Sequence, residues 1–260
     1  MYTLGLDFGS TASKGVILKD GKEIVATSII SFGTGTSGPE KVKEELRKKV
    51  GSTFDEIENT VVTGYGRMKY KAEEDLQISE LSCHTKGVNF LFPTARTIID
   101  IGGQDAKAMK LDENGRMINF MMNDKCAAGT GRFLDVMSGI LETKNSELGK
   151  LDAKATAPVS ISNTCTVFAE SEVISQLSSD AKVEDIVAGI HNSVASRVGA
   201  LVKGVGIEDD VVMVGGVAQN SGVVRALEKV IDRKIHVPEI PQLTGALGAA
   251  VFAYEKADRS

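Results

Sequence analysis

A short glycine-containing motif occurs twice in this chain, first over residues 7–14 (DFGSTASK) and again over residues 100–107 (DIGGQDAK). Each copy follows an apolar run and leads into another, which predicts a strand, a tight glycine turn and a second strand. Glycine at such a turn lets backbone N–H groups approach an anion, and the leading aspartate can hold a metal ion through water. The duplication predicts two lobes that grip a polyphosphate from both sides.

Composition agrees with two compact lobes. The chain has 260 residues, of which 42% are hydrophobic, enough to bury the core of one large or two small domains. The net charge is −5 and the basic residues are scattered, which gives no indication of a nucleic-acid surface. No apolar run reaches the length of a membrane span, and Asp7 interrupts the only segment that could be a signal peptide. We therefore expect a cytoplasmic protein that binds neither nucleic acid nor a membrane.

The expected elements repeat the order β-β-β-α-β-α. The expected strands lie near 2–8, 14–19, 22–31, 60–63, 96–101, 105–111, 116–122 and 210–214. The expected helices lie near 39–50, 79–91, 129–142, 166–177, 183–204, 221–230 and 244–256. This order resembles a ribonuclease-H-like fold and predicts an N-terminal lobe over residues 1–95 and a C-terminal lobe over 96–260.

A third signal lies at residues 211–220 (VVMVGGVAQN), where a buried strand ends in a glycine pair before a helix. Adenosine can lie on such a backbone because no Cβ is in the way. The three segments, in this order, resemble the phosphate-1, phosphate-2 and adenosine motifs of the superfamily of actin, hexokinase and heat-shock chaperone ATPases. The resemblance implies an α/β fold with two ribonuclease-H-like lobes of the actin-like ATPase superfamily.

Residues 33–38 (GTGTSG) match the pattern of a dinucleotide-binding site, but the context is wrong. Such a site also needs an acidic residue at the end of the next strand to bind ribose, and the next expected strand leads to Gly64 with no acid. Pro39 follows the last glycine of the pattern. We interpret the stretch as a loop that leads into a helix. A Walker A sequence is absent from the chain.

The chain has three cysteines, Cys83, Cys126 and Cys165. Cys83 lies inside an expected helix and is interpreted as a buried thiol. Cys126 and Cys165 each precede an expected helix, whose free N–H groups stabilise an anionic centre. Two cysteines cannot complete a four-thiolate site in one chain, but two copies related by a two-fold axis could. Two core or capping cysteines remain the alternative at this point.

Residues 123–134 (NDKCAAGTGRFL) and 165–173 (CTVFAESEV) resemble the cysteine motifs of the activators of 2-hydroxyacyl-CoA dehydratases. The two glycine hairpins, residues 215–220 and residues 245–250 also resemble that family. The resemblance implies a homodimer with one [4Fe-4S] cluster held by Cys126 and Cys165 of both subunits, in a helix-cluster-helix element at the dimer interface. It further implies that reduced ferredoxin or flavodoxin loads the cluster and that ATP hydrolysis drives one electron to the dehydratase.

Site residues follow from the motifs and the resemblance together. The expected binding residues for ATP and ADP are Gly9, Ser10, Thr11, Ala12, Ser13, Lys14, Gly102, Gly103, Gln104, Gly215, Gly216, Gln219 and Asn220. The expected catalytic residues are Asp7, Asp100 and Gln104. The two aspartates would hold Mg²⁺ through water, and either Gln104 or Asp105 would orient the attacking water.

Other polar residues have weaker signals. Lys107 is either a solvated strand lysine or a phosphate contact. His84, His191 and His236 lack metal-ligand spacing and are expected to be structural or exposed. Three alternative functions share the fold: a small-molecule kinase, a regulatory ATPase without redox chemistry, and the ATPase subunit of a benzoyl-CoA reductase. The first two would leave the cysteine motifs without a role.

Overall fold

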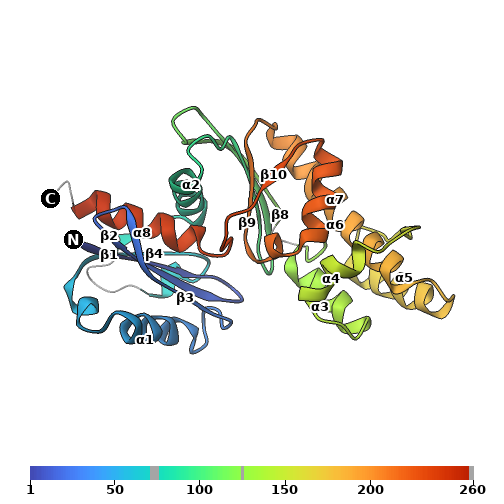
Figure 1. Ribbon diagram of the computed structural model, residues 1–260, viewed down its shortest axis with the longest axis horizontal. Coiled ribbons are helices and arrows are strands. Elements are labelled where there is room, and N and C mark those ends of the chain that lie inside the picture. The colour runs from blue at the N-terminus through green and yellow to red at the C-terminus, as the bar shows by residue number, and fades with distance from the viewer. Residues whose placement is uncertain (71–75, 124–125, 258–260) are drawn as a thin grey trace. The chain divides into compact units, whose positions relative to one another are not determined.

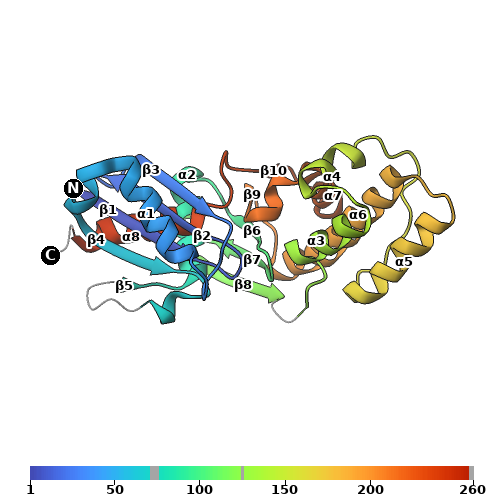
Figure 2. The ribbon, with the colours of Figure 1, turned by 90° about the horizontal axis from the view of Figure 1, so that it is seen from below.

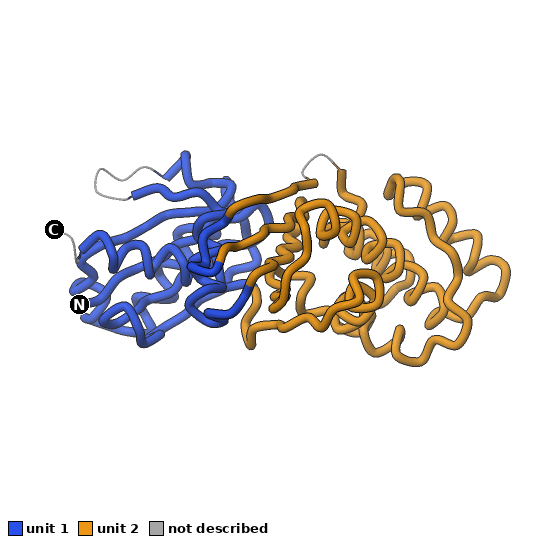
Figure 3. The backbone as a smooth tube through the Cα atoms, turned by 90° about the horizontal axis from the view of Figure 1, so that it is seen from above, with its two compact units in different colours: residues 1–95, 113–117, 242–260 blue, residues 96–112, 118–241 orange. Residues whose placement is uncertain are grey.

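The structure is a computed structural model that describes residues 1–70, 76–123 and 126–257. The chain forms two compact units, which Figure 3 distinguishes by colour. Unit 1 contains residues 1–95, 113–117 and 242–260, and unit 2 contains residues 96–112 and 118–241. The sequence assigned the last segment to the C-terminal lobe, whereas in the structure residues 242–260 belong to the N-terminal unit.

Unit 1 is built on a five-stranded mixed sheet with the order β3-β2-β1-β4-β5. Its strands are β1 (Tyr2–Phe8), β2 (Ser13–Lys19), β3 (Glu23–Ile30), β4 (Ile57–Thr63) and β5 (Leu76–Gln77). The first three strands pair antiparallel, and β4 pairs parallel with both β1 and β5. Its helices are α1 (Gly38–Val50), α2 (Glu80–Leu91) and α8 (Thr244–Ala257), and short 3₁₀ segments cover Gly51–Glu56 and Arg67–Lys69.

Helices cover both faces of this sheet (Figure 1). α1 packs on β2 and β3, where Leu46 joins the same buried cluster as Ile17 (Figure 2). The preceding residue of the strand, Val16, points to the opposite face and packs with Ala246 of α8. Gly5 permits the close contact between α8 and β1, because a Cβ there would overlap the carbonyl oxygen of Ala246. This packing is why the C-terminal helix belongs to unit 1.

Unit 2 repeats the plan with a five-stranded mixed sheet of order β10-β9-β6-β7-β8. Its strands are β6 (Thr97–Ile101), β7 (Ala106–Leu111), β8 (Met117–Asn123), β9 (Val211–Val214) and β10 (Ile235–His236). β6 pairs antiparallel with β7 and parallel with β9, and β9 pairs parallel with β10. Its helices are α3 (Gly131–Ile140), α4 (Asn145–Asp152), α5 (Thr166–Ser178), α6 (Val183–Val205) and α7 (Ser221–Ile231), and Gly216–Gln219 form a 3₁₀ turn.

The long helix α6 supplies much of the core of unit 2. Ile190, Val194 and Val198 recur at helical spacing, are fully buried, and share one cluster with Ile99 of β6 and Met213 of β9. Figure 1 shows α6 and α7 on the same side of this sheet. The core therefore fixes the ends of β6 and β9, where the expected site residues begin.

Counted outward from the central strand, both sheets have the same order, which confirms the expected α/β fold with a repeated lobe. α3 begins later than expected because Gly129 has φ of 83°, a left-handed conformation outside the helix. α4 was not expected from the sequence, because it is short and polar and buries only Leu148 and Gly149. Within the described part of the chain, no helix combines the length and apolar character needed to cross a membrane.

Candidate functional site

The first glycine turn closes the β1–β2 hairpin of unit 1. Asp7 and Lys14 lie opposite each other in the strand register, and Asp7 Oδ2 is 3.0 Å from Lys14 Nζ. The N–H of Gly9 donates to the carbonyl oxygen of Ala12 at 3.0 Å and closes the turn. Thr11 is exposed at the tip. A lysine ammonium beneath a tip of backbone N–H groups is suited to a phosphate group.

The second glycine turn closes the β6–β7 hairpin of unit 2 in the same way. Asp100 lies opposite Lys107, and the N–H of Gly102 donates to the carbonyl oxygen of Asp105 at 3.0 Å. Lys107 is 3% exposed, and its Nζ lies 3.4 Å from Asp100 Oδ2 and 2.9 Å from Asp105 Oδ2. Lys107 is therefore not a solvated strand lysine, because two carboxylates neutralise its charge inside the unit.

The ion pair between Lys107 and Asp105 distinguishes the two residues expected to orient the attacking water, Gln104 and Asp105. The carboxylate of Asp105 is held by Lys107 and folds over the turn, so that a Cβ at Gly102 would lie 2.7 Å from Asp105 Oδ1. Gln104 is exposed at the tip of the turn. Of these two residues, Gln104 is the more exposed and Asp105 is only partly exposed.

A glycine after the neighbouring parallel strand contacts each aspartate. Gly64 follows β4 and Gly215 follows β9, and their φ angles are 89° and 84°. A Cβ at Gly64 would overlap Asp7 Oδ1, and a Cβ at Gly215 would overlap the carbonyl oxygen of the residue after Asp100. Both positions therefore require glycine for backbone conformation and for space. The sequence analysis identified Gly215 but missed Gly64, whose only signal is its place directly after a short strand.

One oxygen of the Asp7 carboxylate lacks a partner within the described structure. Asp7 is 1% exposed, its Oδ2 pairs with Lys14, and its buried Oδ1 accepts no hydrogen bond from any described residue. Leaving such an oxygen unsatisfied costs about 1–3 kcal/mol or more. A hydrated divalent cation would satisfy it, since Mg²⁺ usually keeps several waters and binds carboxylates. The Asp7 carboxylate thus fits the expected magnesium role.

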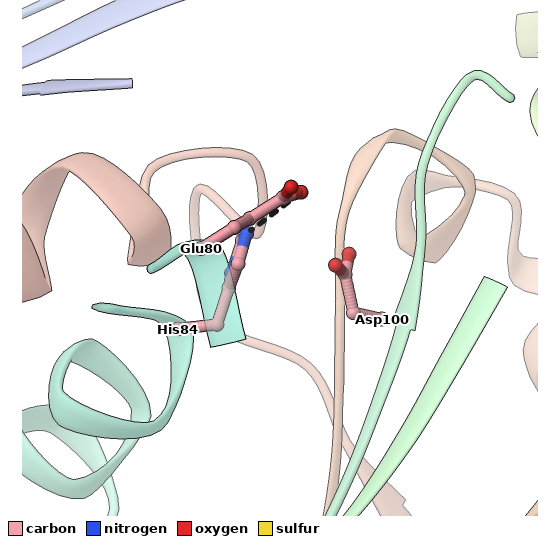
Figure 4. Close-up of side chains that lie close together, drawn as sticks. All are labelled: Glu80, His84 and Asp100. Atoms are coloured by element: carbon pink, nitrogen blue, oxygen red, sulfur yellow. Dashed lines mark ion pairs between the residues drawn. The ribbon is translucent and has the colours of Figure 1, made fainter. Parts of the chain in front are cut away.

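A buried histidine on α2 orders the start of α8 beside this hairpin. Figure 4 shows Glu80 and His84, which lie on α2, and Asp100, which lies on β6. His84 is 4% exposed, its Nδ1 lies 2.9 Å from Thr244 Oγ1, and its Nε2 lies 3.9 Å from Glu80 Oε1. A Cβ at Gly245 would lie 3.1 Å from His84 Nε2. His84 therefore has a structural role, which is one of the two roles expected for it.

The glycine-rich loop before α1 supports the first turn. The hydroxyl of Ser13 donates to the carbonyl oxygen of Phe32 at 2.8 Å. The N–H of Thr34 donates to the carbonyl oxygen of Gly9 at 2.8 Å. The loop then leads into α1 at Gly38. The interpretation of residues 33–38 as a loop before a helix is confirmed.

The third expected segment joins β9 to α7. Gly216 is exposed, and Gly216–Gln219 form a single 3₁₀ turn. Asn220 ends this turn and caps α7, because its side-chain oxygen accepts N–H groups from the first turn of the helix. An exposed glycine backbone before a capped helix gives a nucleoside a surface free of side chains.

The three cysteines occupy two kinds of environment. Cys83 on α2 is fully buried, and burial raises the pKa of its thiol to about 12. Cys126 and Cys165 are partly exposed in unit 2. Cys126 Sγ lies 3.9 Å from the carbonyl oxygen of Thr164, the residue before Cys165. The fold thus brings Cys126 next to the backbone that carries Cys165, while Cys83 is a buried thiol as expected.

The backbone around Cys126 and Cys165 suits an anionic ligand centre. Cys165 is the N-cap residue of α5, and its side chain makes no capping hydrogen bond, so the N–H groups of the first turn remain available. Cys126 does not adjoin a helix directly, because Thr130 is the N-cap of α3. The amide of Asn123 holds the Cys126 loop by donating to the carbonyl oxygens of Cys126 at 3.2 Å and Ala128 at 3.1 Å.

Residues 124 and 125 of this motif lie outside the described residues. Two accessible thiols in one chain supply half of the ligands of a four-thiolate cluster. The donor set therefore fits a cluster shared between two copies of the chain.

The second glycine turn is hydrogen bonded to the start of α3. The N–H of Gly131 donates to the carbonyl oxygen of Gly102 at 2.9 Å, and the N–H of Arg132 donates to that of Gly103 at 2.8 Å. The first N–H groups of a helix have no partners within it, and here the turn satisfies two of them. α3 follows the Cys126 loop directly, so these hydrogen bonds join the second glycine turn to the helix next to that loop.

Comparison with known proteins identifies the class of ATPase that this fold and these hairpins define. Residues 4–253 match the BadF/BadG/BcrA/BcrD ATPase family. The match covers most of the chain, so the chain belongs to this family.

Individual relatives match over nearly their whole lengths. The 2-hydroxyisocaproyl-CoA dehydratase activator of Clostridioides difficile is 65% identical over 260 residues, covering 100% of this chain and 97% of that protein. The (R)-2-hydroxyglutaryl-CoA dehydratase activating ATPase of Acidaminococcus fermentans is 58% identical over 257 residues, covering 99% and 98%. A solved structure of the activator of the 2-hydroxyisocaproyl-CoA dehydratase from Clostridium difficile with bound ADPNP superposes with a TM-score of 0.96 at 65% identity, covering 100% of this chain and 96% of that one. The resemblance to dehydratase activators and the expected two-sheet ATPase fold are confirmed.

Proposed function

We propose that this chain is an ATP-hydrolysing activator of a 2-hydroxyacyl-CoA dehydratase, to which it delivers one electron. The observation that carries the proposal is the connection between two kinds of site in unit 2. The glycine turn of the β6–β7 hairpin is hydrogen bonded to α3, and partly exposed Cys126 lies in the loop that leads into α3, beside Thr164. An ordinary ATPase needs the turn but has no use for the cysteines.

Each unit has one glycine turn suited to phosphate. In unit 1, Lys14 and the backbone of residues 9–13 would bind phosphate, and the spare oxygen of Asp7 would hold hydrated Mg²⁺. In unit 2, residues 102–104 would bind phosphate, and Asp100 would hold Mg²⁺ through water. The loop from Gly215 to Asn220 would carry the adenosine. Gln219 lies in this loop directly before Asn220, the N-cap of α7.

For hydrolysis, we assign the orientation of the attacking water to Gln104. Its side chain is exposed at the turn, whereas Asp105 is tied to Lys107. A side-chain amide can orient water without taking its proton, as phosphoryl transfer through a loose transition state allows. The ammonium of Lys14 stabilises charge that develops on the phosphate oxygens.

The partly exposed thiols would hold a [4Fe-4S] cluster, with Cys126 and Cys165 of a second copy completing the four ligands. When bound, the cluster supplies a single low-potential electron. The chain itself presents both thiols and surrounds Cys165 with available N–H groups of α5. The homodimer has physical support next to Cys165, where Val167 and Phe168 are each 65% exposed and a second copy would cover them.

The electron would come from reduced ferredoxin or flavodoxin and pass to the dehydratase, and we assign this activity to the cytoplasm, where thiols stay reduced. A small-molecule kinase or a regulatory ATPase would use the same turns and give the cysteines no role. The ATPase subunit of a benzoyl-CoA reductase would use the cysteines but serve another acceptor. High identity to two dehydratase activators over their full lengths favours the dehydratase as partner.

The test begins with anaerobic purification and an absorption spectrum. We expect a broad band toward the blue end that dithionite bleaches, and ATP-dependent activation of a purified 2-hydroxyacyl-CoA dehydratase by the reduced protein. A colourless protein that hydrolyses ATP would indicate a regulatory ATPase, and phosphate transfer to a small molecule would indicate a kinase. Electron delivery to benzoyl-CoA reductase alone would indicate that the chain is the ATPase subunit of that enzyme.

A further inference from the structure

A buried histidine lies directly behind the loop between β9 and α7. His191 on α6 is 0% exposed, and its Nε2 lies 3.1 Å from Asn220 Nδ2. Its Nδ1 lies 3.6 Å from Oδ2 of Asp152, the last residue of α4. A single side chain therefore contacts both the cap of α7 and the end of α4.

Hydrogen bonding fixes the tautomer of this histidine. The Oδ1 of Asn220 accepts from the N–H of Gly222 at 3.0 Å and of Val223 at 3.4 Å, so its Nδ2 is the donor that faces His191. The ring Nε2 must then accept, and the ring proton is on Nδ1, directed at Asp152. Nδ1 makes no hydrogen bond to any described residue, so the charge of Asp152 is what stabilises this N–H.

Asp152 is held from its other side by α7. Its Oδ2 accepts from Arg225 Nη2 at 2.6 Å, and the same nitrogen donates to the carbonyl oxygen of Gly149 at 2.8 Å. The ring N–H of His191, and then the guanidinium of Arg225, hold the pKa of Asp152 below its usual range. Asp152 is therefore ionised near neutral pH.

The ring of His191 packs closely against the start of α7. A Cβ at Gly222 would overlap His191 Nδ1, and a Cβ at Gly149 would lie 2.6 Å from Ser221 Oγ. At the other end of the loop, the N–H of Gly215 donates to the carbonyl oxygen of Pro241 at 3.0 Å. The loop is thus anchored at both ends, and its α7 end depends on the Asn220 amide.

We propose that His191 is a positioning residue for the nucleoside end of the nucleotide site, a role that rests on the proposed function above. The neutral ring holds the amide of Asn220 in the orientation that caps α7, and so fixes the end of the loop on which the adenosine lies. A side chain without an acceptor at this position would leave the amide NH₂ unpaired, and the amide would no longer be held in the orientation that caps α7. Affinity for the nucleoside part of the ligand then falls, while hydrolysis of bound ATP continues at its normal rate.

The experiment measures binding of a fluorescent ADP analogue and of pyrophosphate to the full-length dimer. For His191→Leu we expect about fivefold weaker ADP binding, the loss of one helix cap, with pyrophosphate binding and kcat at saturating ATP unchanged. His191→Gln should restore affinity, because its amide can accept from Asn220 and donate toward Asp152. The double variant His191→Leu/Asn220→Ala should lose no more than Asn220→Ala alone.

Unchanged ADP affinity in His191→Leu, or an equal loss for ADP and pyrophosphate, would overturn the proposal. Additive losses in the double variant would do the same. If His191→Leu does not fold, His191→Gln decides the matter, because a loss of ADP affinity in that variant contradicts the assignment. A wild-type protein that binds neither ADP nor pyrophosphate would instead contradict the proposed function.

Discussion

Asp7 and Lys14 face each other across the β1–β2 hairpin with Oδ2 and Nζ 3.0 Å apart, and the ammonium lies directly under the glycine turn. A Cβ at Gly9 would be 3.0 Å from that nitrogen. The second hairpin repeats the pair with Asp100 and Lys107, but there a second carboxylate also binds the lysine. We propose that Lys14 reaches phosphate, whereas Lys107 is neutralised by the two carboxylates of its own hairpin.

Lys14→Ala should abolish most ATP hydrolysis, because it removes the positive charge under the first turn. We expect a loss on the order of 10²-fold or more in kcat. Asp100→Ala should behave similarly by weakening the metal site. Both variants should keep the iron content of the wild type, since the cysteines lie elsewhere. Normal phosphate release by both variants would show that the hairpins do not bind the nucleotide.

Lys107→Met should destabilise the fold more than Lys14→Met does. The first substitution leaves the Asp100 and Asp105 carboxylates close together without the cation that now joins them, and we expect a loss of about 3 kcal/mol in the free energy of unfolding. Lys14 is more accessible and pairs with one carboxylate among the interactions described. Urea titration of the two variants checks this order, and equal midpoints would contradict it.

Gly64→Ala should lose magnesium-dependent ATPase activity. Its Cβ would overlap Asp7 Oδ1, the oxygen that fits hydrated Mg²⁺, and the residue has φ of 89°. Gly35→Ala is the matched control, because φ there is 82° but no atom lies within 4 Å of the added Cβ. Both variants carry similar backbone strain, on the order of 1 kcal/mol. Equal activities would mean that the contact with Asp7 has no catalytic consequence.

The cysteines should differ sharply in iron binding and reactivity. Cys126→Ser and Cys165→Ser should each lose the iron, about four atoms per dimer, and Cys83→Ser should keep it. In cluster-free protein near pH 8, a thiol reagent should modify Cys126 and Cys165 quickly. Cys83 should react only after unfolding, because it is buried and its pKa of about 12 leaves almost no thiolate. Iron retained by both single variants would refute the ligand assignment.

The sequence predicts the hairpins well because their signals are local. An aspartate, a glycine turn and flanking apolar runs all lie within a few residues, and the structure has both turns where they were expected. The place of α8 could not be predicted in this way. It depends on the fit between Gly5 and Ala246, which lie at opposite ends of the chain and carry no shared pattern.

Parts of the candidate site were missed for a similar reason. Gly64 has no motif of its own, and its role comes from the parallel pairing of β4 with β1, which places it against Asp7. His191 is an isolated histidine in a long apolar helix, so only the fold shows that it contacts Asn220 and Asp152. A motif within a few residues can be predicted from the sequence. Contacts between residues that only the strand and helix arrangement brings together cannot.

We propose that nucleotide binding changes the environment of the cysteines through the hydrogen bonds from Gly131 and Arg132 to the second glycine turn. Coupling of this kind is reciprocal and requires that the nucleotide distinguish two states of the cysteine loop. ADP lacks the γ-phosphate and should shift the balance less than ATP. Lys14→Ala is the control, since it should respond weakly to either nucleotide.

The most direct measurement is the rate at which a chelator removes iron from the reduced dimer. We predict that a non-hydrolysable ATP analogue accelerates removal and changes the EPR signal, that ADP does so less, and that the Lys14→Ala dimer shows little response. Identical rates and spectra for the nucleotide-free, ADP-bound and ATP-analogue-bound dimers would contradict the account, even with the expected iron content and ATPase activity.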